Sequence, residues 1–214
     1  DMQLLRQYGN GLIALSACLA GEIPRRLISG DYEGAKAHAL EMRDIFGEDG
    51  YYLELQDHGI REQQEVIEGI VRLHRETGIE LVATNDCHYL TRADAALQDV
   101  LMCIQMGKTV SDPDRMKFET EEFYIKSEEE MKQLFPQYPK ALENTARIAS
   151  LCRVEFEFGV HHLPEFKLPE GYEDRDGYFE KLCMQGFARR YPNADDHDRQ
   201  RLQSEMDMIG RMGF

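Results

Sequence analysis

The chain has 214 residues, 42% of them hydrophobic, and a formal net charge of -15. This composition excludes a disordered protein and allows one substantial core, or one domain and the start of another. No apolar run is long enough to span a bilayer and no basic, apolar leader opens the chain, so we expect neither a membrane span nor a secretory signal. With 40 acidic against 25 basic residues, the surface is not expected to bind nucleic acid by bulk charge.

The chain begins without Met, and we therefore expect it to be a piece of a longer polypeptide. Its cysteines are odd in number, irregularly spaced and without a CxxC pair, which argues against a disulfide framework or a zinc ribbon. They are Cys18, Cys87, Cys103, Cys152 and Cys183. Such cysteines are typical of a reducing compartment, so we expect a cytoplasmic protein.

Three apolar runs of strand length alternate with helical patterns. The runs are GLIALS at 11–16, YYLELQ at 51–56 and IELVAT at 79–84. Apolar residues at steps of three and four predict helices over 31–47 and 63–77, ended by Gly47 and Gly78. Alternation of this kind predicts an α/β fold with a parallel sheet covered on its faces, either an open sheet or a barrel.

Further helices are predicted after the third run. One covers 94–106 and presents Leu97, Val100, Leu101 and Ile104. A capping box formed by Ser127 and Glu130 opens the helix SEEEMKQLF, and another helix follows from Pro139. We expect the last two helices to pack onto the α/β core.

A domain boundary is predicted in the proline-rich and glycine-rich segment 159–177, which has no sustained period. Beyond it, two amphipathic helices are expected over 177–191 and 195–214. They have too few partners of their own, so we assign them to a domain whose remainder is absent.

Candidate functional residues follow each apolar run, where parallel strands end and their loops meet. Cys18 follows the first run, Asp57 and His58 follow the second, and Asp86 and His88 follow the third. Residues two apart in extended backbone project to the same side, so Asp86 and His88 can share one metal ion. Thiolate, imidazole and carboxylate together favour zinc, manganese or iron.

Structural alternatives remain open for the same residues. Asp86 is also suited to a turn or a helix cap, His88 to a loop histidine with ordinary partners, and Cys18 to simple packing. Cys87, between Asp86 and His88, is at this point a possible third ligand.

Other reactive residues are interpreted as structural. Cys103, Cys152 and Cys183 lie on the apolar faces of expected helices and are assigned to the core. His74 continues a helical apolar face, and the adjacent His161 and His162 are not expected to share an ion. The acidic cluster at 195–198 is interpreted as solvated charge at a helix start.

Six motifs in order resemble the C family of bacterial replicative DNA polymerases, and within it the alpha subunits of the DnaE type. They are GLIALSACLAGEIPRRL, YYLELQDHG, ATNDCHYL, DVLMCIQMGK, MKFETEEFYIKSEEEM and ALENTARIA. The resemblance covers essentially the whole chain. It implies that 1–165 form the C-terminal part of a PHP (polymerase and histidinol phosphatase) domain, a distorted seven-stranded β/α barrel. Residues 166–214 would be a linker and the first helices of the polymerase palm region.

The resemblance also implies a metal site. Family members that keep a cluster of divalent ions bind it partly through a Cys, an Asp and a His that match Cys18, Asp86 and His88. With Asp86 and His88 as ligands, Cys87 between them is expected to point away. The family has Gly where this chain has Ala17, a methyl group that we expect to matter little. The family's His-x-His ligands are expected upstream and the polymerase aspartates beyond Phe214, so this segment carries no catalytic residue for polymerisation.

The function implied is that of a segment of a DNA-directed DNA polymerase, which acts on primer-template DNA and deoxynucleotides with magnesium. For the PHP part, one hypothesis is a metal-dependent 3'-5' exonuclease. Another is a structural module that docks a proofreading exonuclease subunit or other replisome subunits. A stand-alone PHP-type phosphoesterase is the alternative for the whole chain.

Overall fold

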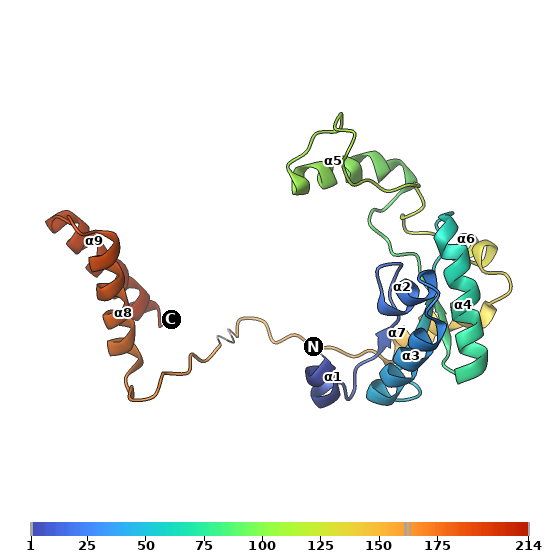
Figure 1. Cartoon of the computed structure of the whole chain (residues 1–214), viewed down its shortest axis with the longest axis horizontal. Coiled ribbons are helices and arrows are strands. Elements are labelled where there is room, and N and C mark those ends of the chain that lie inside the picture. Colours follow the sequence, from blue (N-terminus) through green and yellow to red (C-terminus); the bar gives the residue numbers. More distant parts are fainter. Residues whose placement is uncertain (1, 161, 163, 214) are drawn as a thin grey trace. The chain divides into compact units, whose positions relative to one another are not determined.

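The computed structural model describes residues 2–160, 162 and 164–213 (Figure 1). It has two compact units, Asp1–Val154 and Glu155–Phe214. The first unit combines helices with a small parallel sheet, which confirms the predicted α/β class. The second unit holds the helices α8 and α9.

The sheet of the first unit has the order β1-β2-β3, and both neighbouring pairs are parallel. Its strands are β1 (Ala14–Leu15), β2 (Tyr51–Leu55) and β3 (Leu81–Ala83). The three predicted strands are therefore confirmed, although each is shorter than its apolar run. Because the strands are parallel, the loops that carry the candidate residues all leave from the same edge.

Strand β2 is buried along its whole length. Tyr51, Leu53 and Leu55 belong to the hydrophobic core cluster. Tyr52 and Glu54 alternate with them and therefore face the other side of the sheet. A strand covered on both faces is typical of parallel sheets, and the small sheet is consistent with part of a barrel.

Helices α2 (Glu22–Ile28), α3 (Tyr32–Phe46) and α4 (Arg61–Thr77) contact one another, and both α3 and α4 pack on β2 (Figure 1). Helix α7 (Pro139–Leu151) packs on β3. The predicted ends of α3 and α4 are confirmed, because Gly47 and Gly78 follow them with φ of 85° and 73°.

Two short helices were not predicted. They are α1 (Met2–Tyr8) and α2, each of seven residues. Helix α2 buries Ile23 and Pro24 and has too few turns to display a helical period. The sequence therefore gives only a weak signal for α2, although this helix buries side chains in the core.

Helix α5 (Ala95–Met106) follows a 3-10 turn, η1 (Arg92–Asp94), as the 94–106 pattern predicts. Its buried residues are Met102 and Cys103. The apolar residues Leu97, Val100, Leu101 and Ile104 are exposed by 44–71%. The apolar face of α5 is thus uncovered by the rest of the described chain.

Helix α6 (Glu128–Leu134) begins at the predicted capping box. Glu130 N donates to Ser127 Oγ at 3.2 Å, and Ser127 N donates to the Glu130 carboxylate at 2.8 Å. Its neighbours Phe135 and Ala141 are buried in the core cluster, so the prediction that α6 and α7 pack onto the α/β core is confirmed.

The cysteine predictions have mixed outcomes. Cys103 is buried, as expected. The core assignment of Cys152 is wrong: α7 ends at Leu151, and the extended backbone of Cys152 leaves its side chain exposed. Cys183 is only partly buried, because few elements surround α8. His74 has the expected structural role, since its Nδ1 lies 2.7 Å from Ile79 O.

The second unit contains α8 (Arg175–Arg190) and α9 (Asp196–Met212), which confirms both predicted amphipathic helices. Among its described residues, Met206 is the one buried apolar side chain. The compact units divide after Val154, and the assignment of 1–165 to a PHP domain and of 166–214 to the palm region stays a prediction. The prediction about His161 lies outside the described residues.

Candidate metal site at the strand ends

Asp86 and His88 lie together in the loop after β3. His88 Nε2 is 3.6 Å from Asp86 Oδ1, and the two side chains are 38% and 36% exposed. Ligand atoms that each lie about 2.1 Å from one ion can be at most about 4.2 Å apart. The observed separation is therefore compatible with a shared ion. Both side chains are also open to solvent.

The loop that carries this pair is held by the distant segment 122–124. Asn85 Nδ2 donates to Glu122 O at 2.9 Å and to Tyr124 O at 2.7 Å. His88 N donates to Phe123 O at 2.8 Å. Segment 122–124 thus pairs with the loop after β3 through an isolated bridge between Tyr89 and Tyr124, a contact that no local sequence pattern indicates.

The His88 ring also contacts two aromatic side chains. Its centroid lies 4.8 Å from that of Phe118 and 5.8 Å from that of Phe123. Phe123 is 5% exposed and stacks on His58 with centroids 4.0 Å apart. These contacts restrict the orientation of the His88 imidazole.

Cys18 lies in a tight turn after β1. Gly21 N donates to Cys18 O at 2.7 Å, and a Cβ at Gly21 would lie 2.6 Å from Ser16 O. Ala17 has φ of 66°, a left-handed conformation that costs a residue with a Cβ about 1–2 kcal/mol. The methyl group of Ala17 therefore has a backbone cost that we did not expect from the sequence.

Cys18, Asp86 and His88 do not form a cluster whose ligand atoms all lie within 4.8 Å of one another in the described part of the chain. One ion cannot contact all three side chains in this conformation. Cys87 is not part of such a cluster either, and its Sγ lies 3.4 Å from Tyr124 O.

Asp57 and His58, the possible pocket residues, have partners within the chain. Asp57 accepts from Gly59 N at 2.9 Å and from Gln64 Nε2 at 3.0 Å. The buried His58 contacts Asn85 O through Nε2 at 2.8 Å and Gln63 Nε2 through Nδ1 at 2.6 Å. Burial lowers the pKa of His58 below its ordinary value, which favours the neutral ring.

Sequence reasoning missed two polar residues beside the strand ends, Glu54 and Gln56. Glu54 of β2 is 8% exposed and accepts from Ala17 N and from the side chains of Gln56 and Thr84. Gln56 Oε1 and Asn85 Oδ1 are buried without a hydrogen-bond partner in the described chain. Glu54 and Gln56 stand in an apolar run, where polar residues give no periodic signal. The oxygens of these side chains make the strand-end edge of the sheet rich in hydrogen-bond acceptors, which suits a cation.

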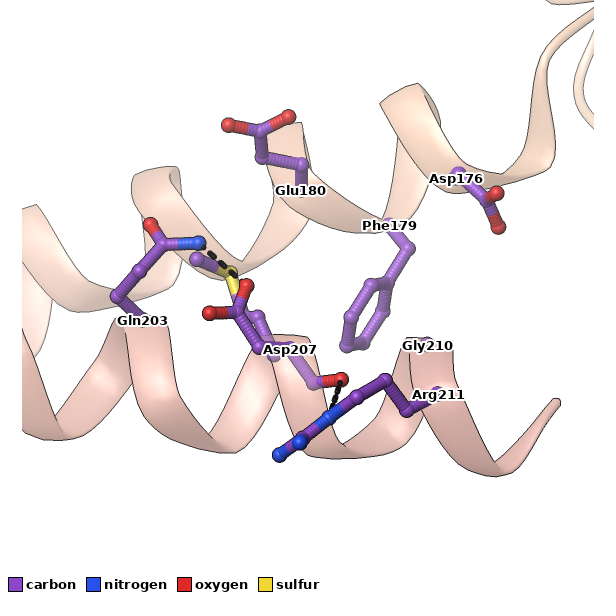
Figure 2. A pocket seen from close by; sticks show the side chains of 8 residues that line it. Asp176, Phe179, Glu180, Gln203, Asp207, Gly210 and Arg211 are labelled. Atoms are coloured by element: carbon purple, nitrogen blue, oxygen red, sulfur yellow. Dashed lines mark hydrogen bonds between the residues drawn. The ribbon is translucent and has the colours of Figure 1, made fainter.

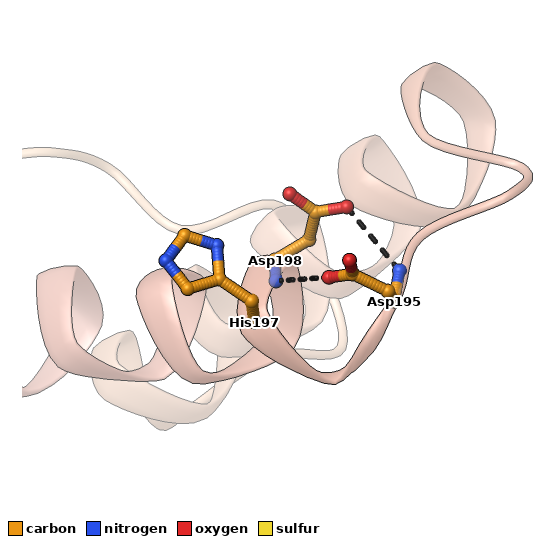
Figure 3. A group of neighbouring side chains, drawn as sticks. All are labelled: Asp195, His197 and Asp198. Carbon is orange, nitrogen blue, oxygen red and sulfur yellow. Dashed lines mark hydrogen bonds between the residues drawn. The ribbon is translucent and has the colours of Figure 1, made fainter.

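The second unit holds a separate acidic cluster of Asp195, His197 and Asp198 (Figure 3). Asp195 Oδ1 accepts from Asp198 N at 2.9 Å, and Asp198 Oδ2 accepts from Asp195 N at 3.2 Å. The two carboxylates thus cap α9, in agreement with the interpretation as helix-start charge. They need no ion to explain their positions.

The groove between α8 and α9 has a volume of about 630 Å³ (Figure 2). Phe179 of α8 points toward α9, and Asp176 of α8 and Asp207 and Arg211 of α9 also line the groove. Gln203 Nε2 donates to Asp207 Oδ1 at 2.9 Å. None of the site residues predicted from the sequence lines this groove.

Comparison with known families identifies the class of the first unit. The PHP domain family matches residues 1–58, a stretch that includes Cys18 but ends before Asp86 and His88. PHP domains of this kind generally bind divalent metals. No helix among the described residues has both the length and the apolar character needed to cross a membrane.

Curated relatives match the whole chain. It is 42% identical to the DNA polymerase III subunit alpha of Treponema pallidum and 43% identical to that of Borreliella burgdorferi, in each case over 100% of this chain. These matches cover 18% and 19% of the relatives. The subunit from Thermus aquaticus is 39% identical over 90% of this chain and 16% of its own length.

The chain therefore belongs to the family of DNA polymerase III alpha subunits, and it matches their PHP region. It spans about a fifth of the length of the curated relatives that it matches.

Proposed function

We propose that this chain is the PHP-containing part of a DNA-directed DNA polymerase and that its strand-end edge binds divalent ions that hydrolyse phosphodiesters at DNA 3' ends. The observation that carries the proposal is the Asp86 and His88 pair, 3.6 Å apart at the open end of β3. Cys18 follows β1 at the same edge of the sheet and supplies a further ligand.

The donor atoms suit divalent ions. A carboxylate and an imidazole favour zinc, manganese or iron, and a thiolate strengthens the preference for zinc or iron. When bound, such ions lower the pKa of a bound water and stabilise the leaving oxygen of a phosphodiester. Asp86 and His88 would hold one ion, while the rings of Phe118 and Phe123 orient the imidazole. Their partial exposure leaves room for a DNA end.

Polymerisation itself belongs, on this proposal, to parts of the polypeptide outside this chain. Residues 1–165 would belong to the PHP domain and 166–214 to a linker and the start of the palm region. The complete enzyme would transfer deoxynucleotides to primer-template DNA with magnesium in the cytoplasm. The match of the whole chain to polymerase subunits supports this proposal over a stand-alone PHP-type phosphoesterase.

An Asp86→Asn variant of the complete polypeptide tests the proposal. Because the amide is a weaker ligand than the carboxylate, we expect 3'-5' hydrolysis of a labelled primer to fall at least about 100-fold while primer extension is retained. Asp44→Asn, at an exposed aspartate of α3, is the matched control and should change neither activity. Undiminished hydrolysis by the Asp86→Asn variant would contradict a nuclease role.

A docking function is the second candidate, and the exposed apolar face of α5 favours it. In this case the ions would stabilise the PHP fold, and a proofreading exonuclease subunit or another replisome subunit would bind its surface. Removal of the ions with a chelator would then lower the unfolding temperature and primer extension together. Loss of hydrolysis alone would favour the nuclease role.

A further inference from the structure

Glu54 is a buried carboxylate at the centre of the sheet. Its exposed fraction is 8%, and it lies on the face of β2 opposite the hydrophobic core. Burying a charge is costly unless hydrogen bonds compensate for the lost water. Glu54 has such bonds, and they come from the ends of both neighbouring strands.

One oxygen of Glu54 binds the turn that carries Cys18. Ala17 N donates to Glu54 Oε2 at 2.8 Å, and Glu54 N donates to Ser16 Oγ at 2.8 Å. Ala17 is the residue with the left-handed backbone, so its amide direction depends on that conformation. A hydrogen bond to a carboxylate is stronger than one to a neutral acceptor and helps to offset the backbone cost.

The other oxygen binds the end of β3. Thr84 Oγ1 and Gln56 Nε2 both donate to Glu54 Oε1, the latter at 3.1 Å. Thr84 stands two residues before Asp86, whose φ of 43° is also left-handed. The single carboxylate of Glu54 therefore connects the two turns that present Cys18 and Asp86.

We propose that Glu54 is a positioning residue that fixes the distance between the Cys18 turn and the Asp86 turn, so that both can bind neighbouring ions of one cluster. This inference rests on the metal site proposed above. Glu54 acts through Ala17 and Thr84, since its oxygens are already occupied by donors from within the chain. Mutation of a group that orients metal ligands in this way commonly lowers metal affinity by about 10- to 100-fold.

Glu54→Gln in the complete polypeptide is the main test. Glutamine has one acceptor oxygen where glutamate has two, so its NH₂ group must face a donor on one side and break one connection. We expect Co²⁺ affinity to fall about 10- to 100-fold and the thiolate-to-cobalt absorption band of Cys18 to weaken at saturating Co²⁺. Glu80→Gln is the matched control. The Glu80 carboxylate lies just before β3 and accepts from Asn144 Nδ2 at 3.2 Å. The Glu80→Gln variant should change neither the Co²⁺ affinity nor the thiolate band.

Thr84→Val provides a second variant if Glu54→Gln does not fold. It removes one donor to Glu54 and preserves the side-chain shape, so a several-fold loss of Co²⁺ affinity in a folded protein supports the positioning role. The positioning role is overturned if the folded Glu54→Gln variant keeps both its Co²⁺ affinity and its thiolate band. If Glu54→Gln does not fold, the same result in Thr84→Val overturns the role.

The metal site itself is checked separately with Cys18→Ser. If the wild-type cobalt spectrum does not change in this variant, Cys18 is not a ligand, and the proposed function fails together with the role of Glu54. If the band depends on Cys18 but not on Glu54, only the positioning role fails.

Discussion

The two compact units use the same kind of amphipathic helix with different results. In the first unit, α3 and α4 bury apolar residues against β2, where Leu53 is fully buried. In the second, α8 and α9 leave Leu182 and Ile209 exposed by 47% and 38%, and Met206 is their one buried apolar residue among those described. Local signals are therefore enough to define a helix, whereas burial needs a neighbouring sheet.

The largest expected difference between the units comes from the core. Leu53→Ala should destabilise the first unit by about 2–5 kcal/mol, because it leaves a cavity beside β2. Leu182→Ala in α8 should cost less than about 1 kcal/mol, since that side chain is half exposed. Hydrogen exchange of peptides from β2 and α8 in the complete polypeptide measures both effects. Equal losses of stability in the two variants would contradict the difference in core packing between the units.

Acidification should also destabilise the first unit through His58. Burial lowers the pKa of His58 below its ordinary value of 6.5, so the unfolded state binds a proton that the folded state excludes. Stability is thus complete above pH 6.5 and decreases as the pH falls, by up to about 1.4 kcal/mol per pH unit.

Hydrogen exchange of β2, corrected for the intrinsic effect of pH, tests this dependence. Peptides from α9, whose His197 is exposed, serve as the internal control. A first unit with a flat response between pH 7 and pH 5 would show that His58 is not buried in the neutral form.

A helix cap should contribute a larger share of the stability in the second unit, which buries little apolar surface. Asp195→Ala removes the side-chain acceptor for Asp198 N and should destabilise α9 by about 1 kcal/mol. Asp196→Ala, at the exposed first position of the same helix, is the control and should cost less. Amide exchange in the first turns of α9 reports the difference, and identical protection in both variants would contradict the capping role.

The smallest expected effect is a gain at the candidate site. Ala17→Gly relieves the left-handed conformation and should stabilise the Cys18 turn by up to about 1 kcal/mol. Ala14→Gly, in the extended backbone of β1, should instead destabilise it. Hydrogen exchange of the amides that follow β1 distinguishes stabilisation from destabilisation. Slower exchange in Ala14→Gly than in Ala17→Gly would contradict a backbone cost at Ala17.

Local patterns predicted most of the elements. The period of α4 and its terminal Gly78 gave that helix directly, and the Ser127 and Glu130 box located α6. The seven-residue helix α2 was missed because it displays fewer than two full turns of period. Cys152 was placed in the core because the period of α7 was continued one residue beyond its end.

For the candidate site, position at a strand end identified Asp86 and His88, which the structure brings to within 3.6 Å. Their support by the segment 122–124 could not be predicted, because the partners are more than thirty residues apart in the sequence. Glu54 was missed because a single carboxylate inside an apolar run has no pattern that distinguishes it from a solvent-facing residue.

The sequence by itself determined the alternation of strands and helices, the caps of α6 and α9 and the identity of the candidate ligands. These features depend on neighbours within a few residues, and side-chain periodicity records such neighbours directly. Only the tertiary structure decided that Glu54 connects two turns, that Phe123 contacts both His58 and His88, and that Cys18 does not share a single-ion cluster with Asp86 and His88. Those relations depend on how distant segments pack, and no local period encodes that packing.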